Sequence, residues 1–282
     1  MSQAQAEETL RVWREAAPFW EKYAPTIRAM FAPLTDALVD DAGITRGQSV
    51  LDVAGGPGEP SLTIAEVVGP TGSVTCTDAV ADMVAAAERE ARRRGVTNIE
   101  FRQCAADSLP FDDDSFDAAV SRLGVMFFPD PVAGLREMLR VVRPGGAVSL
   151  AVWHRSDLNP FAHVITSVVS RHVDTTPAEP GAPDAFRFAE SGALARVLEA
   201  AGAAGVRERV LKFNIAAPVS PAEFWEMRSE TSDTLRWKLA GLSAEERIKV
   251  AQEVEEAVRE FFPEGRMSFP SQMLVVTGKK PV

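Results

Sequence analysis

The chain has 282 residues, of which 46% are hydrophobic and 25% charged, a globular composition that argues against disorder and can bury a full core. The formal net charge of −10 argues against nucleic acid as a partner, because a protein that follows a phosphate backbone usually carries an excess of basic residues. Cys76 and Cys104 are too few for a disulfide framework or a four-thiolate zinc site. The polar start does not look like a secretory signal, and no apolar window approaches the roughly 18 residues of a membrane span, so we expect a cytoplasmic protein without a transmembrane segment.

Short apolar segments rich in β-branched residues alternate with helical segments from Ser49 to Trp153. Gly95 is placed to end the second helix, and Asp130 followed by Pro131 is a typical helix start. The expected strands cover residues 49–54, 73–78, 98–104, 116–123 and 147–153, and the expected helices cover residues 61–68, 82–95 and 130–142. This strict alternation predicts an α/β fold with a parallel, doubly wound, Rossmann-like sheet.

The alternation stops after Trp153. We expect helices over residues 159–173, 190–203, 220–242 and 243–262, a proline-rich connection over 175–184, and strands over 205–216 and 271–280. The whole pattern predicts a mostly parallel, seven-stranded sheet with N-terminal cap helices and a helical insertion between the last two strands. The expected divisions are cap helices in 1–44, a cofactor-binding core in 45–153, a connection in 154–189, the rest of the sheet in 190–216 and 270–282, and a helical lid in 217–269.

The turn after the first strand is a glycine cluster. In VLDVAGGPGEP, Asp52 precedes Gly55, Gly56 and Gly58, and the absent side chains let a ligand approach the backbone beside the next helix. A dinucleotide loop would carry a third glycine where this chain has Ser61. A carboxylate here would also repel a pyrophosphate, whereas it would attract the ammonium and sulfonium of S-adenosylmethionine, which we therefore expect as the cofactor.

Two further acids follow the next two strands. Asp78 closes the second strand, the position from which a carboxylate accepts hydrogen bonds from ribose hydroxyls. Asp107 closes the third, where it could receive the adenine amino group, with Ala106 and Ser108 at the ring edge and Met83 on the ring face. Each acid alone could be a solvated strand end or a helix cap, but the carboxyl ends of parallel strands meet in one crevice, so together they predict one site.

The motifs of residues 45–153 resemble those of class I S-adenosylmethionine-dependent methyltransferases, and within them the branch that includes the ubiquinone/menaquinone biosynthesis C-methyltransferases. The resemblance rests on VLDVAGGPGEP, TCTDAVADMV, CAADSLPFDDDSFDAAVSRLGVMFF and LREMLRVVRPGG. It implies methyl transfer from S-adenosylmethionine, with an aromatic side chain of the N-terminal helix, for which we expect Tyr23, at the cofactor. Pro57 departs from the pattern, because relatives usually carry threonine or another small polar residue there, and proline removes a donor and stiffens the turn.

Arg122, directly after the fourth strand, has two roles open to it. It could pair with the methionine carboxylate or an acidic acceptor, or it could form a structural salt bridge. The acidic turn DDDS is interpreted as solvated, and no metal is expected, because three successive carboxylates cannot all face one ion. The expected cofactor-binding residues are Tyr23, Asp52, Ala54, Gly55, Gly56, Pro57, Gly58, Asp78, Ala79, Met83, Ala106, Asp107, Ser108 and Arg122.

Aromatic residues are concentrated outside the cofactor half, with none between Phe31 and Phe101. Those in the N-terminal helices and the late insertion could close over the crevice as a lid and stack on a flat acceptor, although aromatics on accessory helices most often serve only to attach them. The expected acceptor is small and apolar or aromatic. The expected pocket residues are Trp20, Met126, Phe127, Trp153 and Trp225.

A sulfonium methyl is already activated, so the protein has to align the acceptor and, where the acceptor carries a proton, remove it. His154, directly after the fifth strand, is the first candidate for a catalytic base, and His163 is the second. His163 and His172 share one expected helix and face opposite ways, so at most one can reach the pocket. A reaction without a side-chain base stays open.

Two other classes of protein compete with this interpretation. The first is a nicotinamide-dependent oxidoreductase, disfavoured by Ser61 and Asp52; the second is a non-catalytic protein that keeps the cofactor pocket as a sensor or a partner-binding module. The expected partner is a small-molecule acceptor. The sequence leaves the oligomeric state open, with a dimer as one option.

Overall fold

The computed structural model describes residues 3–173 and 182–282, and its centre is a seven-stranded sheet in the order β3-β2-β1-β4-β5-β7-β6. β1 to β5 are parallel, and β7 runs antiparallel to both β5 and β6, which confirms the mostly parallel sheet. The strands are β1 Ser49–Val53, β2 Ser73–Asp78, β3 Ile99–Gln103, β4 Phe116–Arg122, β5 Val142–Trp153, β6 Ala204–Ala217 and β7 Met267–Lys279.

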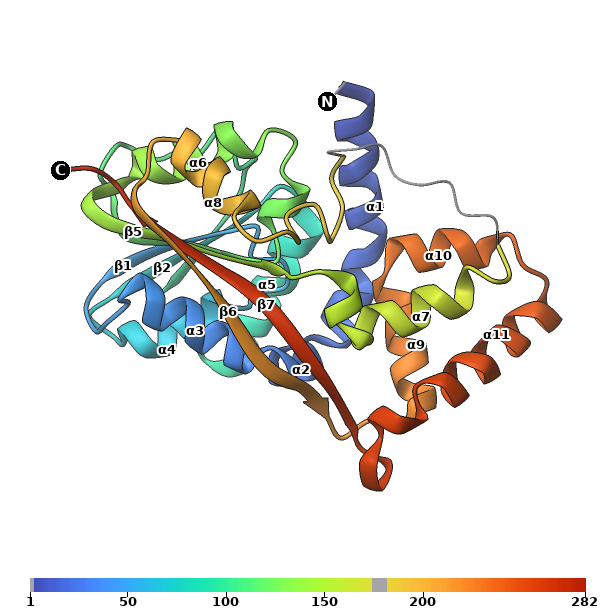
Figure 1. Cartoon of the computed structure of the whole chain (residues 1–282). Coiled ribbons are helices and arrows are strands. Elements are labelled where there is room, and N and C mark those ends of the chain that lie inside the picture. The colour runs from blue at the N-terminus through green and yellow to red at the C-terminus, as the bar shows by residue number, and fades with distance from the viewer. Residues whose placement is uncertain (1–2, 174–181) are drawn as a thin grey trace.

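Helices cover both faces of the sheet and gather at one of its ends (Figure 1). The α-helices are α1 Gln3–Lys22, α2 Ala24–Met30, α3 Ala32–Ala42, α4 Ser61–Val68, α5 Ala81–Arg94, α6 Pro131–Val141, α7 Pro160–Val169, α8 Ala193–Ala200, α9 Pro221–Thr231, α10 Asp233–Ala240 and α11 Ala244–Ala257. The 3-10 helices are η1 Val125–Phe127, η2 Ser156–Leu158, η3 Arg259–Phe261 and η4 Pro263–Gly265. α3 and α4 lie on one face and α6 and α8 on the other; α4 and α6 each belong to a crossover between parallel strands, whereas α3 precedes β1.

The predicted helix signals in the core are confirmed. The Asp130 side chain accepts a hydrogen bond from the Ala133 amide and caps α6, and Gly95 ends α5 in a left-handed conformation. Ser243 and Glu246 form a capping box at the start of α11. The ends of these helices are therefore set by residues at the ends themselves, and distant contacts are not needed to explain them.

The insertion differs from the expectation in two places. The helix expected over 220–242 is interrupted at Ser232, whose side chain caps a separate helix, α10. The helix expected over 159–173 ends at Val169, so His172 lies beyond it and the prediction that His163 and His172 share a helix is wrong. A serine that accepts a hydrogen bond from a backbone amide can begin a new helix inside a segment whose composition favours one long helix.

The last two strands extend beyond the rest of the sheet. β7 begins at Met267, earlier than the expected residue 271, and β5 ends at Trp153 opposite Met273, so the first residues of β7 pair with β6 alone. In this stretch one edge of β7 has no neighbouring strand. Pro270 is tolerated there because proline has no amide N–H to donate, and a free edge offers no strand to receive it. The ribbon of β6 and β7 leads into α9, α10 and α11.

The helical insertion and the N-terminal helix form one assembly at the carboxyl end of the parallel strands (Figure 1). α9 contacts α1, α10 and α11, and α7 packs against α11. The hydrophobic core continues from the sheet into this assembly through buried residues that include Phe161, Phe224 and Phe269. Within the two described ranges, no helix has the length and apolar content needed to span a bilayer.

Candidate cofactor and acceptor site

The glycine turn after β1 is pressed against the sheet on one side and open on the other. A side chain at Gly55 would meet Cys76 Sγ at 2.7 Å and Asp52 Oδ2 at 2.8 Å, so only glycine fits there. Gly56 has a φ of +55°, and a Cβ built on it meets no atom within 4 Å. The backbone at Gly56 therefore borders open space, which is the property that a ligand-binding turn needs.

Asp52 lies beneath this turn and is fully buried. Its Oδ2 accepts hydrogen bonds from the Ser61 hydroxyl at 2.5 Å and from the Ser61 amide at 3.1 Å, while Oδ1 is buried without a hydrogen-bond partner in the described structure. Burial raises the pKa of Asp52 to about 7, against the opposing effect of the Ser61 hydroxyl. Ser61, which replaces the third glycine of a dinucleotide loop, thus ties the start of α4 to Asp52.

Asp78 ends β2 beside Gly56 and is partly buried. Its Oδ2 accepts from the Gly56 amide at 3.0 Å and its Oδ1 from the Val80 amide at 2.9 Å. Burial raises the pKa of Asp78, although these backbone donors favour the charged form. Each carboxylate oxygen keeps a lone pair for another donor, so Asp78 can hold the glycine turn and accept bonds from a ligand hydroxyl.

Asp107 lies beyond the end of the third strand and not at its last position. β3 ends at Gln103, so Asp107 belongs to the following turn and does not close the strand. Its side chain and that of Ser108 are exposed, and Ala106 is partly buried. These groups lie after β3 at the same sheet edge as Asp78, and their contacts with adenine remain a prediction.

α1 crosses this edge. Met83 is buried in a cluster with Ala17 of α1 and Val80, and Trp13 meets Phe127 edge-on with the ring centroids 5.0 Å apart. Met83 thus packs in a cluster that includes a residue of α1, and its contact with the adenine ring remains a prediction.

α1 is fastened to α9 by polar contacts. The Tyr23 hydroxyl donates to Glu230 Oε2 at 2.7 Å, Lys22 pairs with the same carboxylate at 2.8 Å, and the Trp20 indole donates to the Thr231 carbonyl at 3.1 Å. Burial raises the pKa of Tyr23 to about 12. Glu230 was not a sequence candidate; the Tyr23 hydroxyl is directed toward it, and contact of Tyr23 with the cofactor remains a prediction.

Arg122 is the last residue of β4, and its guanidinium bonds to neutral groups. It donates to Thr35 Oγ1 at 2.8 Å and to the Glu59 carbonyl at 3.2 Å, and it lies over the Phe31 ring at 5.9 Å. Burial lowers its pKa, opposed by the charges of Glu59 and Asp52. No ion pair among the described residues includes Arg122, and its pairing with a carboxylate of the cofactor or the acceptor remains a prediction.

The aromatic residues near the end of β5 form a continuous cluster. Trp153 stacks on Phe161 with the centroids 6.0 Å apart and meets Phe31 edge-on at 5.9 Å. Met126 is buried, whereas Phe127 and Trp225 are partly buried and pack against the same core. The expected pocket residues thus belong to the hydrophobic core or pack against it, and whether any of them touches an acceptor remains a prediction.

His154 is held in one tautomer. Its Nδ1–H donates to the Ala189 carbonyl at 2.7 Å, which leaves Nε2 as a proton acceptor. Asn159, fully buried, fixes the turn that carries His154 because its amide donates to the His154, Arg155 and Gln272 carbonyls, each at 3.0 Å. Asn159 was missed from the sequence because its partners include residues of β7, far along the chain.

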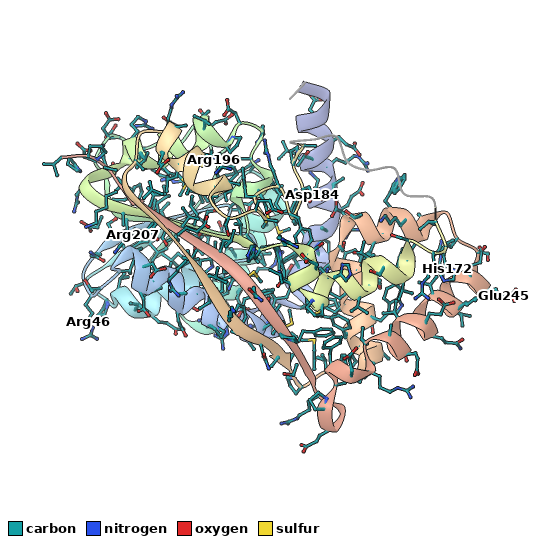
Figure 2. The ribbon with its side chains drawn as sticks, in the orientation of Figure 1. Arg46, His172, Asp184, Arg196, Arg207 and Glu245 are labelled. Atoms are coloured by element: carbon teal, nitrogen blue, oxygen red, sulfur yellow. The ribbon has the colours of Figure 1, made fainter. Side chains whose placement is uncertain are left out.

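The other two histidines, His163 and His172, do not directly follow a strand of the sheet. His163 is exposed on α7, where its Nε2 lies 3.5 Å from the Ser167 hydroxyl. His172 lies at the outer side of the insertion (Figure 2), where its Nε2 is 3.0 Å from Glu253 of α11. Of the three, only His154 directly follows β5, and its role as a base remains a prediction.

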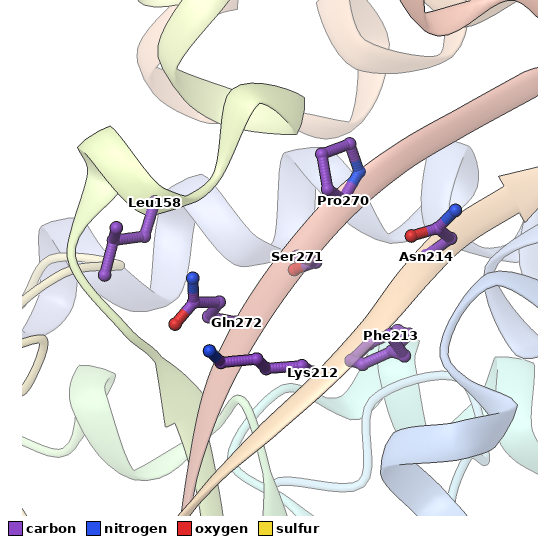
Figure 3. Close-up of a pocket in the computed structure, with 7 residues that line it drawn as sticks. All are labelled: Leu158, Lys212, Phe213, Asn214, Pro270, Ser271 and Gln272. Carbon is purple, nitrogen blue, oxygen red and sulfur yellow. The ribbon is translucent and has the colours of Figure 1, made fainter.

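A shallow hollow of about 250 Å³ lies next to the turn that carries His154 (Figure 3). Leu158 of η2 forms one wall, and Lys212 and Gln272 come from the paired stretch of β6 and β7. The Gln272 carbonyl accepts from the His154 amide, so this hollow is on the outer side of the same turn. It lies apart from the glycine turn.

Two carboxylates of the acidic turn after β3 form ion pairs with two different basic side chains. Asp113 pairs with Arg140 at 2.8 Å, and Asp114 pairs with Lys280. The successive carboxylates point to different partners, as the interpretation of a solvated turn expects.

The sheet order, the open glycine turn and the acids at the ends of β1 and β2 together define a class I S-adenosylmethionine-dependent methyltransferase fold. The donor set fits that cofactor, because Gly56 borders open space and the buried Asp52 Oδ1 has no partner in the described chain. Residues 34–166 match the model of the ubiE/COQ5 methyltransferase family. The matched segment is therefore a methyltransferase domain of this type, with S-adenosylmethionine as its cofactor.

Known proteins agree with this assignment of the domain. An uncharacterised protein of Mycobacterium tuberculosis is 38% identical over 150 residues, which are 53% of each chain. The ubiquinone/menaquinone biosynthesis C-methyltransferase UbiE of Hahella chejuensis is 41% identical over 133 residues, 47% of this chain and 53% of that protein. The matches thus span about half the length of these relatives.

A solved structure supports the fold over a longer stretch. Phosphoethanolamine N-methyltransferase 2 of Haemonchus contortus, in complex with S-adenosyl-L-methionine, has a TM-score of 0.56 and 14% identity, with 95% of this chain and 60% of that chain covered. The fold is therefore similar well beyond the segment that matches the family in sequence.

Proposed function

We propose that this chain is a methyltransferase of class EC 2.1.1 that moves the methyl group of S-adenosylmethionine to a small, apolar or aromatic acceptor by in-line displacement. The main support is the backbone at Gly56, which borders open space next to the Asp78 carboxylate. The tryptophan-bearing helix α1 packs nearby, against Val80 and Met83. The cofactor supplies an activated methyl group, so the chain's own task is binding, alignment and exclusion of water.

Each part of the proposed site has a distinct role. Asp78 orders the glycine turn and accepts hydrogen bonds from ribose, and the charge of Asp52 favours the cationic end of the cofactor. The buried cluster of Trp153 and Phe161 makes the end of β5 apolar, which favours an apolar acceptor beside it. The His154 Nε2 takes a proton from the acceptor where it carries one, while Nδ1–H stays bound to the Ala189 carbonyl.

The first test is calorimetric titration of the protein with S-adenosylhomocysteine, with NADH titrated in parallel. We expect micromolar binding of S-adenosylhomocysteine and none of NADH. Binding of NADH alone would instead support an oxidoreductase. A protein that binds the cofactor but releases no S-adenosylhomocysteine with any of a pooled set of acceptors would favour the non-catalytic alternative.

Replacing Asp78 with alanine should weaken S-adenosylhomocysteine binding by about 1–3 kcal/mol, because charge-assisted hydrogen bonds to ribose are lost. The Gly56 and Val80 amides also lose their acceptor, so the turn becomes less ordered. The titration is repeated on Asp78→Ala and on Asp82→Ala, a matched control whose exposed side chain lies on the first turn of α5. Equal affinities for wild type and Asp78→Ala would remove Asp78 from the site.

His154→Ala should reduce turnover by about 100-fold or more while leaving S-adenosylhomocysteine affinity unchanged, because a positioned base acts on the acceptor. The comparison variant is His163→Ala, whose exposed ring should be dispensable. Initial rates and calorimetric affinities are measured on both variants with the acceptor found in the screen. A parallel loss of affinity and turnover in His154→Ala would mean that His154 acts by supporting the fold and not as a base.

A further inference from the structure

Arg228, in the helical insertion, forms no ion pair with any residue that the structure describes. Arg228 lies on α9, its Nε is buried, and that atom has no hydrogen-bond partner within the described ranges. Its guanidinium lies over the Phe161 ring at 4.8 Å. Desolvation lowers the pKa of Arg228 to about 10, and the nearest opposing influence is the charge of Asp233, on an exposed side chain beyond ion-pair distance.

This arrangement is costly for a residue that only supports the fold. The Arg228 side chain as a whole is partly exposed, but its Nε–H is buried, and a buried donor of a charged group normally gains a carboxylate because leaving it without a partner is unfavourable. Arg94 shows the usual solution in the same protein, since it is largely buried and pairs with Glu59 and Glu66, each at 2.5 Å. The free Nε–H of Arg228 therefore points to an anion supplied from outside the chain.

The position of Arg228 matches the acceptor end of the site. Phe161, on which it stacks, is itself stacked on Trp153 at the carboxyl end of β5. Phe31 links the same cluster to Arg122, whose partners are the Thr35 hydroxyl and the Glu59 carbonyl. Two partly buried guanidinium groups thus flank one aromatic cluster, and their field favours a negative charge there even though the whole chain carries a net charge of −10.

We infer that Arg228 binds a carboxylate of the methyl acceptor, and that the acceptor is a flat, mainly apolar acid. A carboxylate matches the planar fork of a guanidinium, with Nε–H and one terminal N–H donating to its two oxygens. Phe161 and Trp153, both almost fully buried, pack behind this position, so the body of the same molecule is expected to be mainly apolar. This inference rests on the proposed function, because it describes the acceptor of that reaction.

Binding of a model acid tests the charge preference. Protein saturated with S-adenosylhomocysteine is titrated with 2-naphthoate and with its neutral analogue 2-naphthamide. Wild type should bind 2-naphthoate at least about tenfold more tightly than the amide, and Arg228→Met should lose that preference while keeping its affinity for S-adenosylhomocysteine. No binding of 2-naphthoate by wild type, or the same preference in Arg228→Met, overturns the inference; absence of S-adenosylhomocysteine binding overturns the proposed function.

Thermal unfolding without ligands separates a binding role from a structural one. Arg228→Met should raise the Tm by about 2–4 °C, because methionine fills the space of the arginine stem and removes a buried N–H that has no partner in the described structure. Arg94→Met should lower the Tm, since it leaves Glu59 buried without its partner. A fall in Tm for Arg228→Met comparable to that of Arg94→Met would show that Arg228 supports the fold, and the inference would fail.

Discussion

Replacing Gly56 with valine should weaken S-adenosylhomocysteine binding by about 100-fold or more while leaving the protein folded. The Cβ of the added side chain would meet no protein atom, because nothing lies within 4 Å of that position. It would instead project into the space beside the Asp78 carboxylate, to which the Gly56 amide donates at 3.0 Å. Calorimetric titration gives the affinity, and thermal unfolding shows how much of the fold remains.

Gly95→Val is the matched control. Gly95 also has a positive φ, 69° against 55° at Gly56, and a Cβ there also meets nothing within 4 Å, but it lies at the end of α5 away from the turn. Both variants should lose roughly 1–2 kcal/mol of stability to the left-handed backbone conformation. Only Gly56→Val should lose the ligand. Similar affinities in the two variants would mean that the ligand does not approach the backbone at Gly56.

The cofactor half of the site could be predicted from the sequence because each of its residues is marked by the strand directly before it. Asp52, Gly56 and Asp78 each lie at or just after the end of a strand, and strand ends in a parallel sheet converge whatever the rest of the chain does. The order of strands and helices up to Trp153 followed from the same alternation. Asp107 was misplaced by a few residues because a strand end inside a polar turn has no sharp sequence signal.

The lid half could not be predicted because its contacts join distant parts of the chain. Tyr23 and Glu230 are 207 residues apart, and Asn159 and Gln272 are 113 residues apart. Arg228 gave no signal at all, since an arginine in a mixed helix looks like any solvated residue until packing removes its water. The division of α9 from α10 at Ser232 likewise depends on one side-chain bond that helix propensity does not reveal.

Replacing Asp52 with asparagine should stabilise the protein without ligands at pH 8 by about 2–4 kcal/mol relative to wild type, and far less at pH 5. Burial raises the pKa of Asp52 from its ordinary value near 4 to about 7. Between these values the folded state holds a proton that the unfolded state has lost, so the contribution of Asp52 to stability is complete below pH 4 and is lost as the pH rises through about 7. Asparagine does not titrate, so the gap between the two melting temperatures should widen from pH 5 to pH 8.

The same carboxyl should couple cofactor binding to protons. The ammonium and sulfonium of S-adenosylmethionine favour the ionised form of Asp52, so binding at pH 7 should release about half a proton, because the pKa of about 7 leaves roughly half of the free protein protonated. Titrations in buffers of different ionisation enthalpy measure this release, which Asp52→Asn should lack. Ser61→Ala should move the release to higher pH, because the Ser61 hydroxyl donates to Oδ2 and favours the charged carboxylate. Equal proton release by wild type and Asp52→Asn would place the titrating group elsewhere and leave Asp52 a buried anchor for the start of α4.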